Sequence, residues 1–240
     1  MIASYLTTEE IKQYKNSIVL IPYGSFEQHG PYLPLITDSA IAESICERIE
    51  QTIPDKVLLY PTLWIGDSSE HDGFDGTLSL KASTSIKVLE EIFTWLQKSQ
   101  FKKCIVYNAH GGNVNLGRTI AEDFSRANNL KVKFVDGFSS SFDKAAIDLF
   151  GYSEPHAGSV ETSLLYTLRP NLRKTDKIVI EGIQKYPGNF SLFKTKDLSE
   201  SGILNGDTIL TIDIKKAETL ISIMEQDLTT AINKMLDLKL

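Results

Sequence analysis

Apolar residues along this chain fall into two alternating patterns, short continuous runs and longer stretches with helical spacing. Runs rich in β-branched residues predict four buried strands, at Ser17–Tyr23, Val57–Tyr60, Lys103–Asn108 and Lys131–Asp136. Apolar positions spaced by three and four residues predict helices at Ser39–Ile53, Ser83–Gln97, Asn115–Asn128, Gly158–Leu168 and Ile214–Leu238. Because strands and helices alternate, we predict an α/β layered sandwich with a mostly parallel central sheet.

The remaining segments are less regular. Hydroxyl and acidic side chains at Thr7–Glu10 are typical of a helix start. The stretch Lys177–Asp213 is rich in Gly, Ser and Asn and holds only short β-like pieces, such as KIVI at 177–180. No linker, low-complexity tract or internal repeat interrupts the chain, and 240 residues can bury one large core. We therefore expect a single domain over residues 1–240.

Composition and charge narrow the classes of function. The chain is 42% hydrophobic and 23% charged, as in ordinary globular proteins, and its net charge is -6. A nucleic-acid partner is not expected, because binding of phosphates requires a basic surface. The sequence shows no stretch of about 20 apolar residues and no basic, apolar leader, so we expect a cytoplasmic protein without a membrane partner. Cys46 and Cys104 fit a reducing compartment and are expected to be buried.

The four histidines are the most informative residues. Each of them, His29, His71, His110 and His156, lies in a turn-rich segment that also contains Gly, Pro or an acidic residue. A single histidine is more often a structural residue than a ligand. Four histidines in such surroundings instead favour a functional site.

The segment after the first predicted strand, Gly24–Asp38, holds three candidate metal ligands. Glu27 and His29 are two residues apart, so both would point the same way in an extended chain. Ligands collect at the carboxyl ends of parallel strands, and two carboxylates with an imidazole suit Zn²⁺, Mn²⁺ or Fe²⁺. Asp38 or its neighbour Thr37 could instead cap the following helix, and the two roles are compatible.

Three further segments hold candidate site residues. His110 directly follows another strand in the sequence NAHGGN, whose glycines allow the backbone to approach a ligand closely. Glu161 lies near the start of a helix, where a structural first-turn acid accounts for it as well as ligation does. His156 precedes that helix and could be a general acid or a substrate contact. His71 could line a pocket, contact another subunit or take part in catalysis.

Together these segments resemble the creatininase (creatinine amidohydrolase) family. The motifs that carry the resemblance run in order over nearly the whole chain: PYGSFEQHG at 22–30, EHDGFDGT at 70–77, NAHGGN at 108–113, HAGSVETS at 156–163 and GILNGD at 202–207. The HGGN form is similar to that of the archaeal formylamino-pyrimidine nucleotide deformylases and of the branch that trims the mycofactocin precursor peptide. The motifs are specific for the family and not for a substrate.

The resemblance implies a homohexamer with two divalent metal ions per chain, Zn, Mn or Fe. It implies that Glu27 and His110 bind one metal, that His29 binds the other, and that Asp38 bridges both. Glu161 would complete the ligands of the second metal or stand close to it. A hydroxide that bridges the metals would attack the carbonyl, and His156 would protonate the leaving nitrogen. His156 and Glu161 are therefore the expected catalytic residues.

Creatinine itself is not the expected substrate. Family members that act on creatinine look like HYEN where this chain has HGGN, so Gly112 stands where a metal-binding glutamate would be. Those members also hold the substrate with tryptophans between this motif and the later histidine. The aromatic residues of that interval here are Phe138, Phe142, Phe150 and Tyr152.

We therefore expect a metal-dependent amidohydrolase that cleaves a non-peptide C–N bond, in a cyclic amide or a formamide, of a small polar substrate. The alternatives are a deformylase of a formylamino-pyrimidine ribonucleotide in flavin or F420 synthesis, a metallopeptidase that trims a short peptide, and a metal-binding scaffold without turnover. A phosphorylated substrate would require Lys or Arg near the site. Arg118 is a candidate for that contact, and its alternative role is that of a solvated helix residue.

Overall fold

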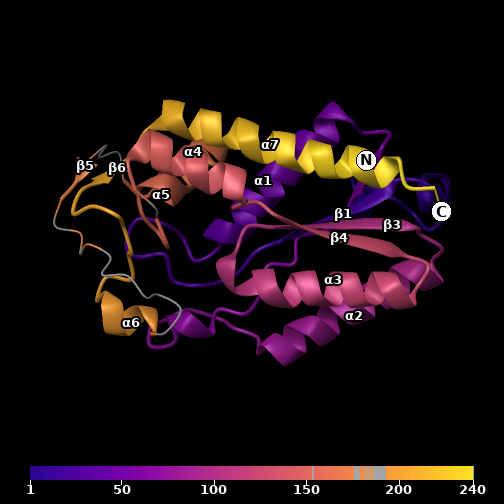
Figure 1. Ribbon diagram of the computed structural model, residues 1–240, viewed down its shortest axis with the longest axis horizontal. Helices are drawn as coiled ribbons and strands as arrows, with labels where there is room; N and C mark the ends of the chain where they lie inside the picture. The colour runs from indigo at the N-terminus through magenta and orange to yellow at the C-terminus, as the bar shows by residue number, and fades with distance from the viewer. Residues whose placement is uncertain (153, 176–178, 182, 184, 186–192, 240) are drawn as a thin grey trace.

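Four parallel strands form the central sheet of the protein (Figure 1). The structure is a computed structural model and describes residues 1–152, 154–175, 179–181, 183, 185 and 193–239. The strands lie in the order β2-β1-β3-β4 and are β1 (Ile18–Tyr23), β2 (Val57–Leu59), β3 (Lys103–Asn108) and β4 (Lys131–Asp136). A helix separates each of these strands from the next in the sequence, as parallel pairing requires.

Helices cover both faces of this sheet and give three layers (Figure 1). On one face lie α1 (Thr37–Thr52), α4 (Ser140–Phe150), α5 (Ser159–Leu168) and α7 (Ile214–Leu236), and on the other lie α2 (Ala82–Lys98) and α3 (Val114–Ala127). Successive residues of β1 alternate between the two cores. Ile18 and Leu20 pack with the first group of helices, and Val19 and Ile21 pack with the second. The predicted α/β sandwich is confirmed.

The register of the strands brings their carboxyl ends to one edge of the sheet. Tyr23 of β1 pairs with Asn108 of β3, which in turn pairs with Asp136 of β4. The segments that follow these three strands therefore begin side by side. Two of them carry Glu27 and His110, so the fold places the first and second candidate segments together.

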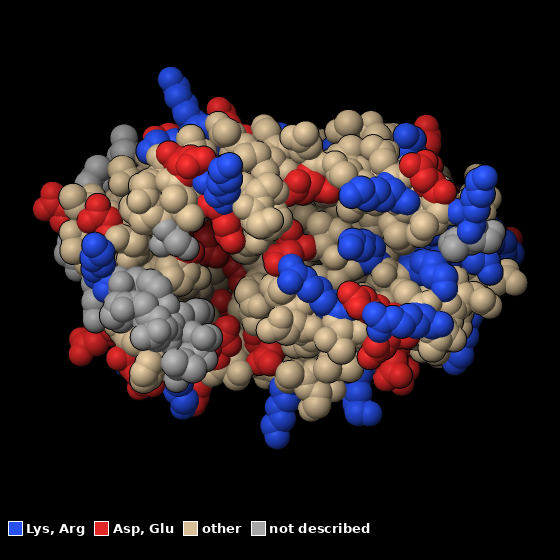
Figure 2. All heavy atoms as spheres, viewed as in Figure 1, with Lys and Arg blue, Asp and Glu red and all other residues tan. Residues whose placement is uncertain are grey.

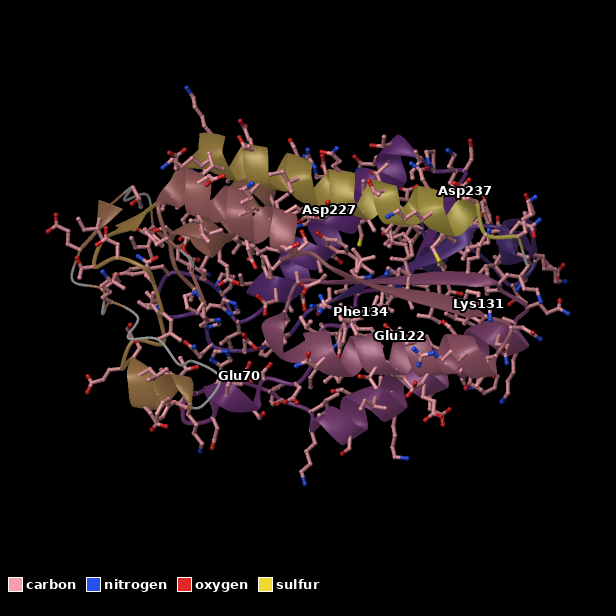
Figure 3. The ribbon with its side chains drawn as sticks, in the orientation of Figure 1. Glu70, Glu122, Lys131, Phe134, Asp227 and Asp237 are labelled. Atoms are coloured by element: carbon pink, nitrogen blue, oxygen red, sulfur yellow. The ribbon has the colours of Figure 1, made fainter. Side chains whose placement is uncertain are left out.

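Close packing of α3 on β4 fixes the course of the chain after β3. The ring of Phe134 lies between β4 and α3 (Figure 3), and any side chain at Gly117 of α3 would overlap with it. Glycine at this position lets the helix approach the sheet. The 3₁₀ helix Gly111–Asn113 (η4), which ends the NAHGGN motif, leads directly into α3 and is thereby held at the edge of the sheet.

The segment between α5 and α7 is less regular, as expected. There β5 (Val179–Ile180) and β6 (Leu210–Thr211) pair antiparallel, and α6 (Thr195–Leu198) is a single turn. Of the KIVI piece expected to be β-like, residues 177 and 178 lie outside the described residues, and residues 179 and 180 form β5. Among the helices that the structure describes, none is long and apolar enough to cross a membrane.

The helix start expected at Thr7–Glu10 is confirmed, but the helix that begins at Glu10 is a short 3₁₀ helix and not an α-helix. The hydroxyl of Thr7 accepts from the N–H of Glu10 at 3.3 Å, and the side chain of Glu10 in turn accepts from the hydroxyl and the backbone N–H of Thr7. Short 3₁₀ helices, Ala3–Tyr5 (η1) and Glu10–Tyr14 (η2), are all that forms in this part of the chain.

Helix α4 was not predicted from the sequence. The side chain of Ser139 accepts a hydrogen bond from the N–H of Phe142 and so caps the start of the helix. Gly151 ends the helix in the left-handed conformation, with φ of 88°. Both signals are present in the sequence and would have predicted the helix.

Candidate metal centre

Asp38 lies in the first turn of α1, directly behind the loop that follows β1. The capping role considered for it is wrong, because the N-cap residue is Ile36 and no side chain caps this helix. Thr37 does not cap it either, since its hydroxyl donates to the carbonyl of Pro34 at 2.6 Å. The Asp38 carboxylate instead accepts a hydrogen bond from Ser25 Oγ at 2.7 Å to its Oδ2. The loop after β1 therefore orients this carboxylate.

One group of ligand-type side chains consists of Glu27, Asp38 and His110. Nδ1 of His110 lies 3.0 Å from Oδ2 of Asp38, and its Nε2 lies 3.4 Å from Oε2 of Glu27. All three side chains are buried, and one donor atom of each lies within 4.8 Å of the others. This spacing and donor set fit one divalent cation.

A second group consists of His29, Asp38 and Glu161. Nε2 of His29 lies 3.0 Å from Oδ1 of Asp38 and 4.0 Å from Oε2 of Glu161. One donor atom of each residue again lies within 4.8 Å of the others. Asp38 thus belongs to both groups, with one oxygen near a histidine of each.

Backbone carbonyls orient three of the four histidines. A ring nitrogen of each lies within hydrogen-bond distance of a carbonyl oxygen: His29 Nδ1 at 3.1 Å from Glu27, His110 Nε2 at 2.6 Å from Asp67, and His156 Nε2 at 2.8 Å from Gln28. A carbonyl oxygen only accepts, so each of these nitrogens carries the proton. When a cation is bound, the other nitrogen of each ring can offer it a lone pair, and metal-binding histidines are usually oriented in this way.

Glu27 is the least satisfied polar side chain of the site. It is fully buried, and neither of its carboxylate oxygens accepts a well-aligned hydrogen bond from the described part of the chain. The nearest side-chain nitrogens, Nε2 of His71 and Nε2 of His110, lie 3.1 and 3.4 Å away. A buried carboxylate without aligned donors is costly, and a cation would compensate it. The residues present therefore fit a divalent metal.

The carboxylates and histidines of the site strongly perturb one another. Burial raises the pKa of Glu27. The charges of His110 and His71 together outweigh burial and lower this pKa to about 2. Burial lowers the pKa of His29, but Asp38 raises it to about 10. The pKa of Asp38 is lowered as well, because His29 and His110 outweigh its burial. Glu27 and Asp38 are thus ionised and need positive charge beside them, which imidazolium protons or divalent cations can supply.

His156 lies beside both groups. Its Nδ1 is 3.7 Å from Oε1 of Glu27, and with Glu27 and His29 it forms a third group of ligand-type side chains. Its ring packs against those of His29 and His71, with centroids 4.5 and 4.2 Å apart. Burial, then the neighbouring His71 and His29, hold the pKa of His156 well below its usual range. A neutral His156 leaves Nδ1 able to accept a proton.

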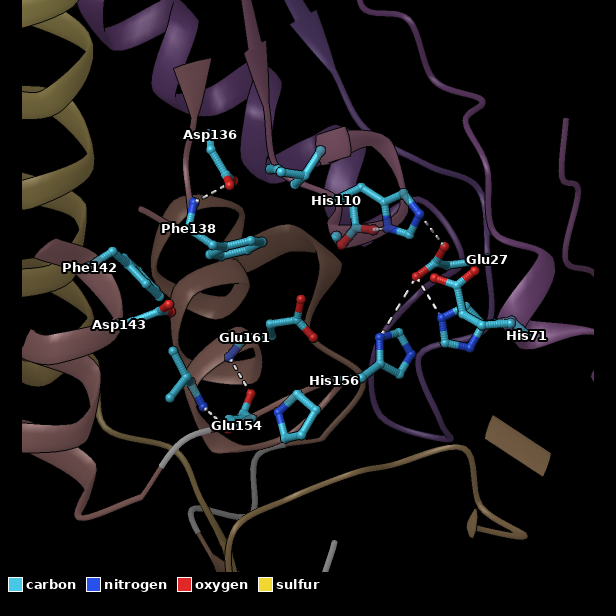
Figure 4. Close-up of a pocket in the computed structure, with 17 residues that line it drawn as sticks. Glu27, His71, His110, Asp136, Phe138, Phe142, Asp143, Glu154, His156 and Glu161 are labelled. Atoms are coloured by element: carbon cyan, nitrogen blue, oxygen red, sulfur yellow. Dashed lines mark hydrogen bonds and ion pairs between the residues drawn. The ribbon is translucent and has the colours of Figure 1, made fainter. Parts of the chain in front are cut away.

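Glu154, which the sequence did not single out, lies beside Glu161 at the start of α5. Glu154 accepts backbone hydrogen bonds at the start of α5, from the N–H groups of Gly158, Val160 and Glu161. It therefore takes the structural role of an acid at a helix N-terminus. The Glu161 side chain accepts from the N–H of Ala157 and lines the same cavity as Glu27 and Asp38 (Figure 4). Burial raises its pKa to about 7.

The site opens into a cavity of about 350 Å³. Acidic residues that were not expected there share its wall: Glu70, Asp136, Asp143 and Glu154. No Lys or Arg is found among the described residues that line it, and acidic side chains gather in a hollow on the face shown in Figure 2. Asp136 could have been found from the sequence, because it is the last residue of β4 and therefore reaches the same edge as Asn108.

The aromatic residues considered as substrate contacts divide into two pairs. Phe138 and Phe142 line the cavity, with ring centroids 5.1 Å apart (Figure 4). Phe150 and Tyr152 are not among its described lining residues, and the hydroxyl of Tyr152 donates to Ser159. The cavity wall thus combines two phenylalanine rings with carboxylates.

Arg118 does not reach the cavity. Its side chain is 55% exposed, and its guanidinium pairs with Asp136 at 3.1 Å. It is absent from the described residues that line the cavity, although Asp136 is one of them. The structure therefore gives Arg118 no role in holding a substrate phosphate.

The backbone around Gly112 leaves no room for a side chain. A Cβ atom at this position would overlap with the carbonyl of Asp67 and lie 2.7 Å from Nε2 of His110. These two groups are hydrogen-bonded to each other. A glutamate at position 112 would therefore disrupt the contact that orients His110.

Comparisons with known proteins agree with this geometry. A protein-family model described as "Creatininase: Creatinine amidohydrolase" matches residues 4–232. The chain is 32% identical over 167 residues to "Mycofactocin precursor peptide peptidase" of Mycobacterium ulcerans, an alignment that covers 67% of this chain and 62% of that protein. It is 29% identical over 125 residues to "2-amino-5-formylamino-6-ribosylaminopyrimidin-4(3H)-one 5'-monophosphate deformylase" of Methanocaldococcus infernus, covering 50% of this chain and 52% of that protein.

The fold is also found among solved structures. A crystal structure of creatinine amidohydrolase (creatininase) superimposes with a TM-score of 0.81 and 21% identity, over 99% of this chain and 98% of that one. At this identity the match shows the fold. The chain spans less than two thirds of the length of the two curated relatives, so their activities are no more than candidates for this protein.

Proposed function

This chain belongs to the creatininase family, and we propose that it is a metal-dependent amidohydrolase that cleaves a non-peptide C–N bond, in a cyclic amide or a formamide, of a small polar substrate. The observation that carries the proposal is the position of Asp38 between two groups of ligand-type side chains at the floor of a cavity. Glu27 and His110 would hold one ion with it, and His29 and Glu161 would hold the other. Zn, Mn or Fe would suit these oxygen and nitrogen donors.

When bound, two divalent ions supply an activated water molecule and polarise the carbonyl that it attacks. His156 is suited to the proton transfers of such a reaction. Its Nε2 is bonded to the carbonyl of Gln28, so its Nδ1 is the nitrogen that exchanges protons. The low pKa of His156 keeps the ring neutral, with a lone pair at Nδ1, and it makes the protonated ring a strong acid toward a leaving nitrogen.

The cavity limits the size and charge of the substrate. At about 350 Å³ it is of the size that holds a small molecule. The carboxylates of Asp136 and Asp143 would repel a phosphate group there, and no described lining residue is basic. Substrates with a neutral or positively charged end therefore fit better than phosphorylated ones. This argues against the ribonucleotide deformylase as the activity of this chain.

Creatinine also fits poorly. Gly112 has no room for the metal-binding glutamate expected in creatinine-specific members, because of the Asp67 carbonyl. The rings at the cavity wall are those of Phe138 and Phe142 and not of tryptophan. These differences support a different small amide as the substrate.

A second candidate is a metallopeptidase that trims a short peptide. The observation that favours it is the 32% identity to the mycofactocin precursor peptide peptidase. The same metal site could attack a peptide carbonyl, and the cavity is open to solvent beside Asp143, whose side chain is exposed. The two candidates differ in their products, since the peptidase releases amino acids or a shortened peptide.

A panel of amides tests the proposal. Metal-free protein reloaded with Zn, Mn or Fe is incubated with cyclic amides, formamides, phosphorylated formamides and short peptides, and the new amine, carboxylate or formate is quantified. Turnover of non-phosphorylated cyclic amides or formamides supports the proposal. Turnover confined to peptides favours the second candidate, and binding of metal without any turnover would support a scaffold.

We also propose a homo-oligomer, a hexamer by resemblance, in the cytoplasm. Trp95 of α2 and Trp64, which follows β2, are 62% and 47% exposed. An interface between copies of the chain would cover these rings. Cys46 and Cys104 are buried and unpaired, which fits a reducing compartment. The acidic net charge gives no support for a nucleic-acid partner.

A further inference from the structure

His71 differs from the other three histidines in the groups that surround its ring. Its Nδ1 lies 3.0 Å from the amide nitrogen Nε2 of Gln28 and 2.8 Å from the hydroxyl of Thr195. Its Nε2 lies 3.1 Å from Oε1 of Glu27. The other three rings each donate to a backbone carbonyl, whereas Nδ1 of His71 faces groups that can donate.

The orientation of the Gln28 amide is fixed by two backbone groups. Its Oε1 accepts from the N–H of Gly30 at 3.0 Å, and its Nε2 donates to the carbonyl of Gly202 at 3.1 Å. The reversed amide would place two donors together at Gly30 and two acceptors together at Gly202. The nitrogen of Gln28 is therefore the atom that faces the histidines.

Counting hydrogens then fixes the protonation pattern around Gln28. The amide nitrogen carries two hydrogens and has three groups in range: Gly202 O, His71 Nδ1 and His156 Nε2 at 2.9 Å. Nε2 of His156 already carries a proton, because it donates to the carbonyl of Gln28. The two amide hydrogens therefore go to Gly202 and to Nδ1 of His71.

We propose that Gln28 is a positioning residue that holds His71 in the tautomer protonated at Nε2, so that the protonated nitrogen lies beside the carboxylate of Glu27 and His71 does not bind metal. His71 then stabilises the charge on Oε1 of Glu27, 3.1 Å away. The other oxygen of this carboxylate, Oε2, stays available to a cation held together with Asp38 and His110. The four histidines thus divide into three that offer a lone pair to the site and one that supports a ligand carboxylate.

This assignment rests on the proposed function only in taking Glu27 as a metal ligand. The positions of the protons are measured without any substrate. Long-range ¹H–¹⁵N correlation spectra of ¹⁵N-histidine-labelled protein distinguish protonated from unprotonated ring nitrogens. The spectra are recorded at neutral pH, metal-free and after addition of Zn²⁺, and a His71→Gln spectrum identifies the signals of His71. We expect an unprotonated Nδ1 and a protonated Nε2 for His71 in both states.

Zinc is expected to shift ring-nitrogen signals of His29 and His110 strongly and to leave the protonation of His71 unchanged. A protonated Nδ1 in His71, or an Nε2 that loses its proton when Zn²⁺ binds, would overturn the inference. Failure of the amidohydrolase proposal alone would leave these spectra unaffected, so the two outcomes can be told apart.

Variants test the role of Gln28 independently. Gln28→Glu has nearly the same shape but cannot donate, so Nδ1 of His71 becomes the protonated nitrogen and Zn²⁺ affinity falls by about 10- to 100-fold. Gln51→Glu makes the same chemical change at an exposed position of α1 and leaves both the spectrum and the affinity unchanged. His71→Gln retains the number of zinc ions bound per chain, measured by mass spectrometry of the metal content. Loss of an ion in His71→Gln, or an unchanged His71 tautomer in Gln28→Glu, would contradict the proposal.

Discussion

Oδ2 of Asp38 lies 3.0 Å from Nδ1 of His110, although one residue begins a helix after β1 and the other follows β3. The contact exists because β1 and β3 are neighbours in the sheet and end at the same edge. The other oxygen of Asp38 lies 3.0 Å from His29. A single carboxylate therefore links the two halves of the candidate metal centre.

Asp38→Asn is expected to weaken the binding of both ions. Substitution of a ligand that belongs to one group only should weaken the binding of one ion. The amide retains the shape of the side chain but loses the charge shared by the two groups. Loss of metal assistance is worth several kcal/mol, so turnover should fall by about 1000-fold or more. Calorimetric titration with Zn²⁺ measures the binding, and Asp55→Asn, an exposed site, is the matched control. Two intact binding events in Asp38→Asn would exclude a bridging role.

Gly112→Ala is expected to destabilise the protein, whereas Gly111→Ala is not. A Cβ at position 112 overlaps with the Asp67 carbonyl, but a Cβ at position 111 meets nothing within 4 Å. Overpacking of this kind costs about 1 to 3 kcal/mol in free energy of unfolding. Urea denaturation of both variants measures the difference. Equal stabilities would show that the Asp67 loop yields easily, and the structural argument against a residue such as glutamate at position 112 would then fail.

The free energy of unfolding should depend on the protonation of Asp136 between about pH 4 and pH 7. Burial raises the pKa of this carboxyl to about 6, and Arg118 opposes the effect. The folded state therefore holds the proton more tightly than the unfolded state, and the stabilisation is complete below the unfolded pKa and is lost as the pH rises through 6. Asp136→Asn lacks this titrating group and therefore this loss. The free energy of unfolding of the variant, minus that of the wild type, should rise by at most about 3 kcal/mol from pH 4 to pH 7.

Urea denaturation of metal-free wild type and Asp136→Asn at several pH values measures that gain. The Arg118 pair is lost at every pH in the variant, so only the change of the difference with pH reports on the carboxyl. A difference that stays constant from pH 4 to pH 7 would show that the pKa of Asp136 is not raised.

The acidic wall of the cavity should set the charge preference of the enzyme. Among amides of similar size, those that carry an ammonium group should have kcat/KM values at least about tenfold above those that carry a phosphate, a difference of about 1.4 kcal/mol. Asp143→Asn should reduce this preference through KM, because the exposed carboxylate of Asp143 lies at the cavity wall and not in the ligand groups. A preference for phosphorylated amides would instead restore the deformylase assignment.

Much of the fold follows from local patterns in the sequence. The strands β1, β2 and β3 were predictable because each holds a continuous apolar run that is buried on both faces, and β4 was predictable although its Lys133 is exposed. Strand β2 alone ends one residue earlier than expected, at Leu59. Helix α4 was not predicted, although Ser139 and Gly151 mark its two ends. The order of the strands could not be read from periodicity, since pairing depends on contacts between residues far apart in the chain.

The candidate ligands were predictable for a different reason. Glu27 and His110 follow strands directly, so the rule for parallel sheets places them at one edge, and the structure brings them together with His29, Asp38 and Glu161. Asp143 of the cavity wall was not predicted, because the helix that carries it, α4, was not expected. The role of Glu154 at the start of α5 also required the structure, since only its hydrogen bonds separate it from Glu161.

Restoration of turnover by metal tests the central claim most directly. Wild-type protein is stripped with a chelator, titrated with Zn²⁺, Mn²⁺ or Fe²⁺, and assayed at each step with the best amide of the panel, while bound metal is counted per chain. We predict no turnover in the stripped protein and recovery that reaches its maximum at two ions per chain, with no recovery in Asp38→Asn. Turnover that survives complete removal of metal, or full recovery with fewer than one ion per chain, would contradict the account.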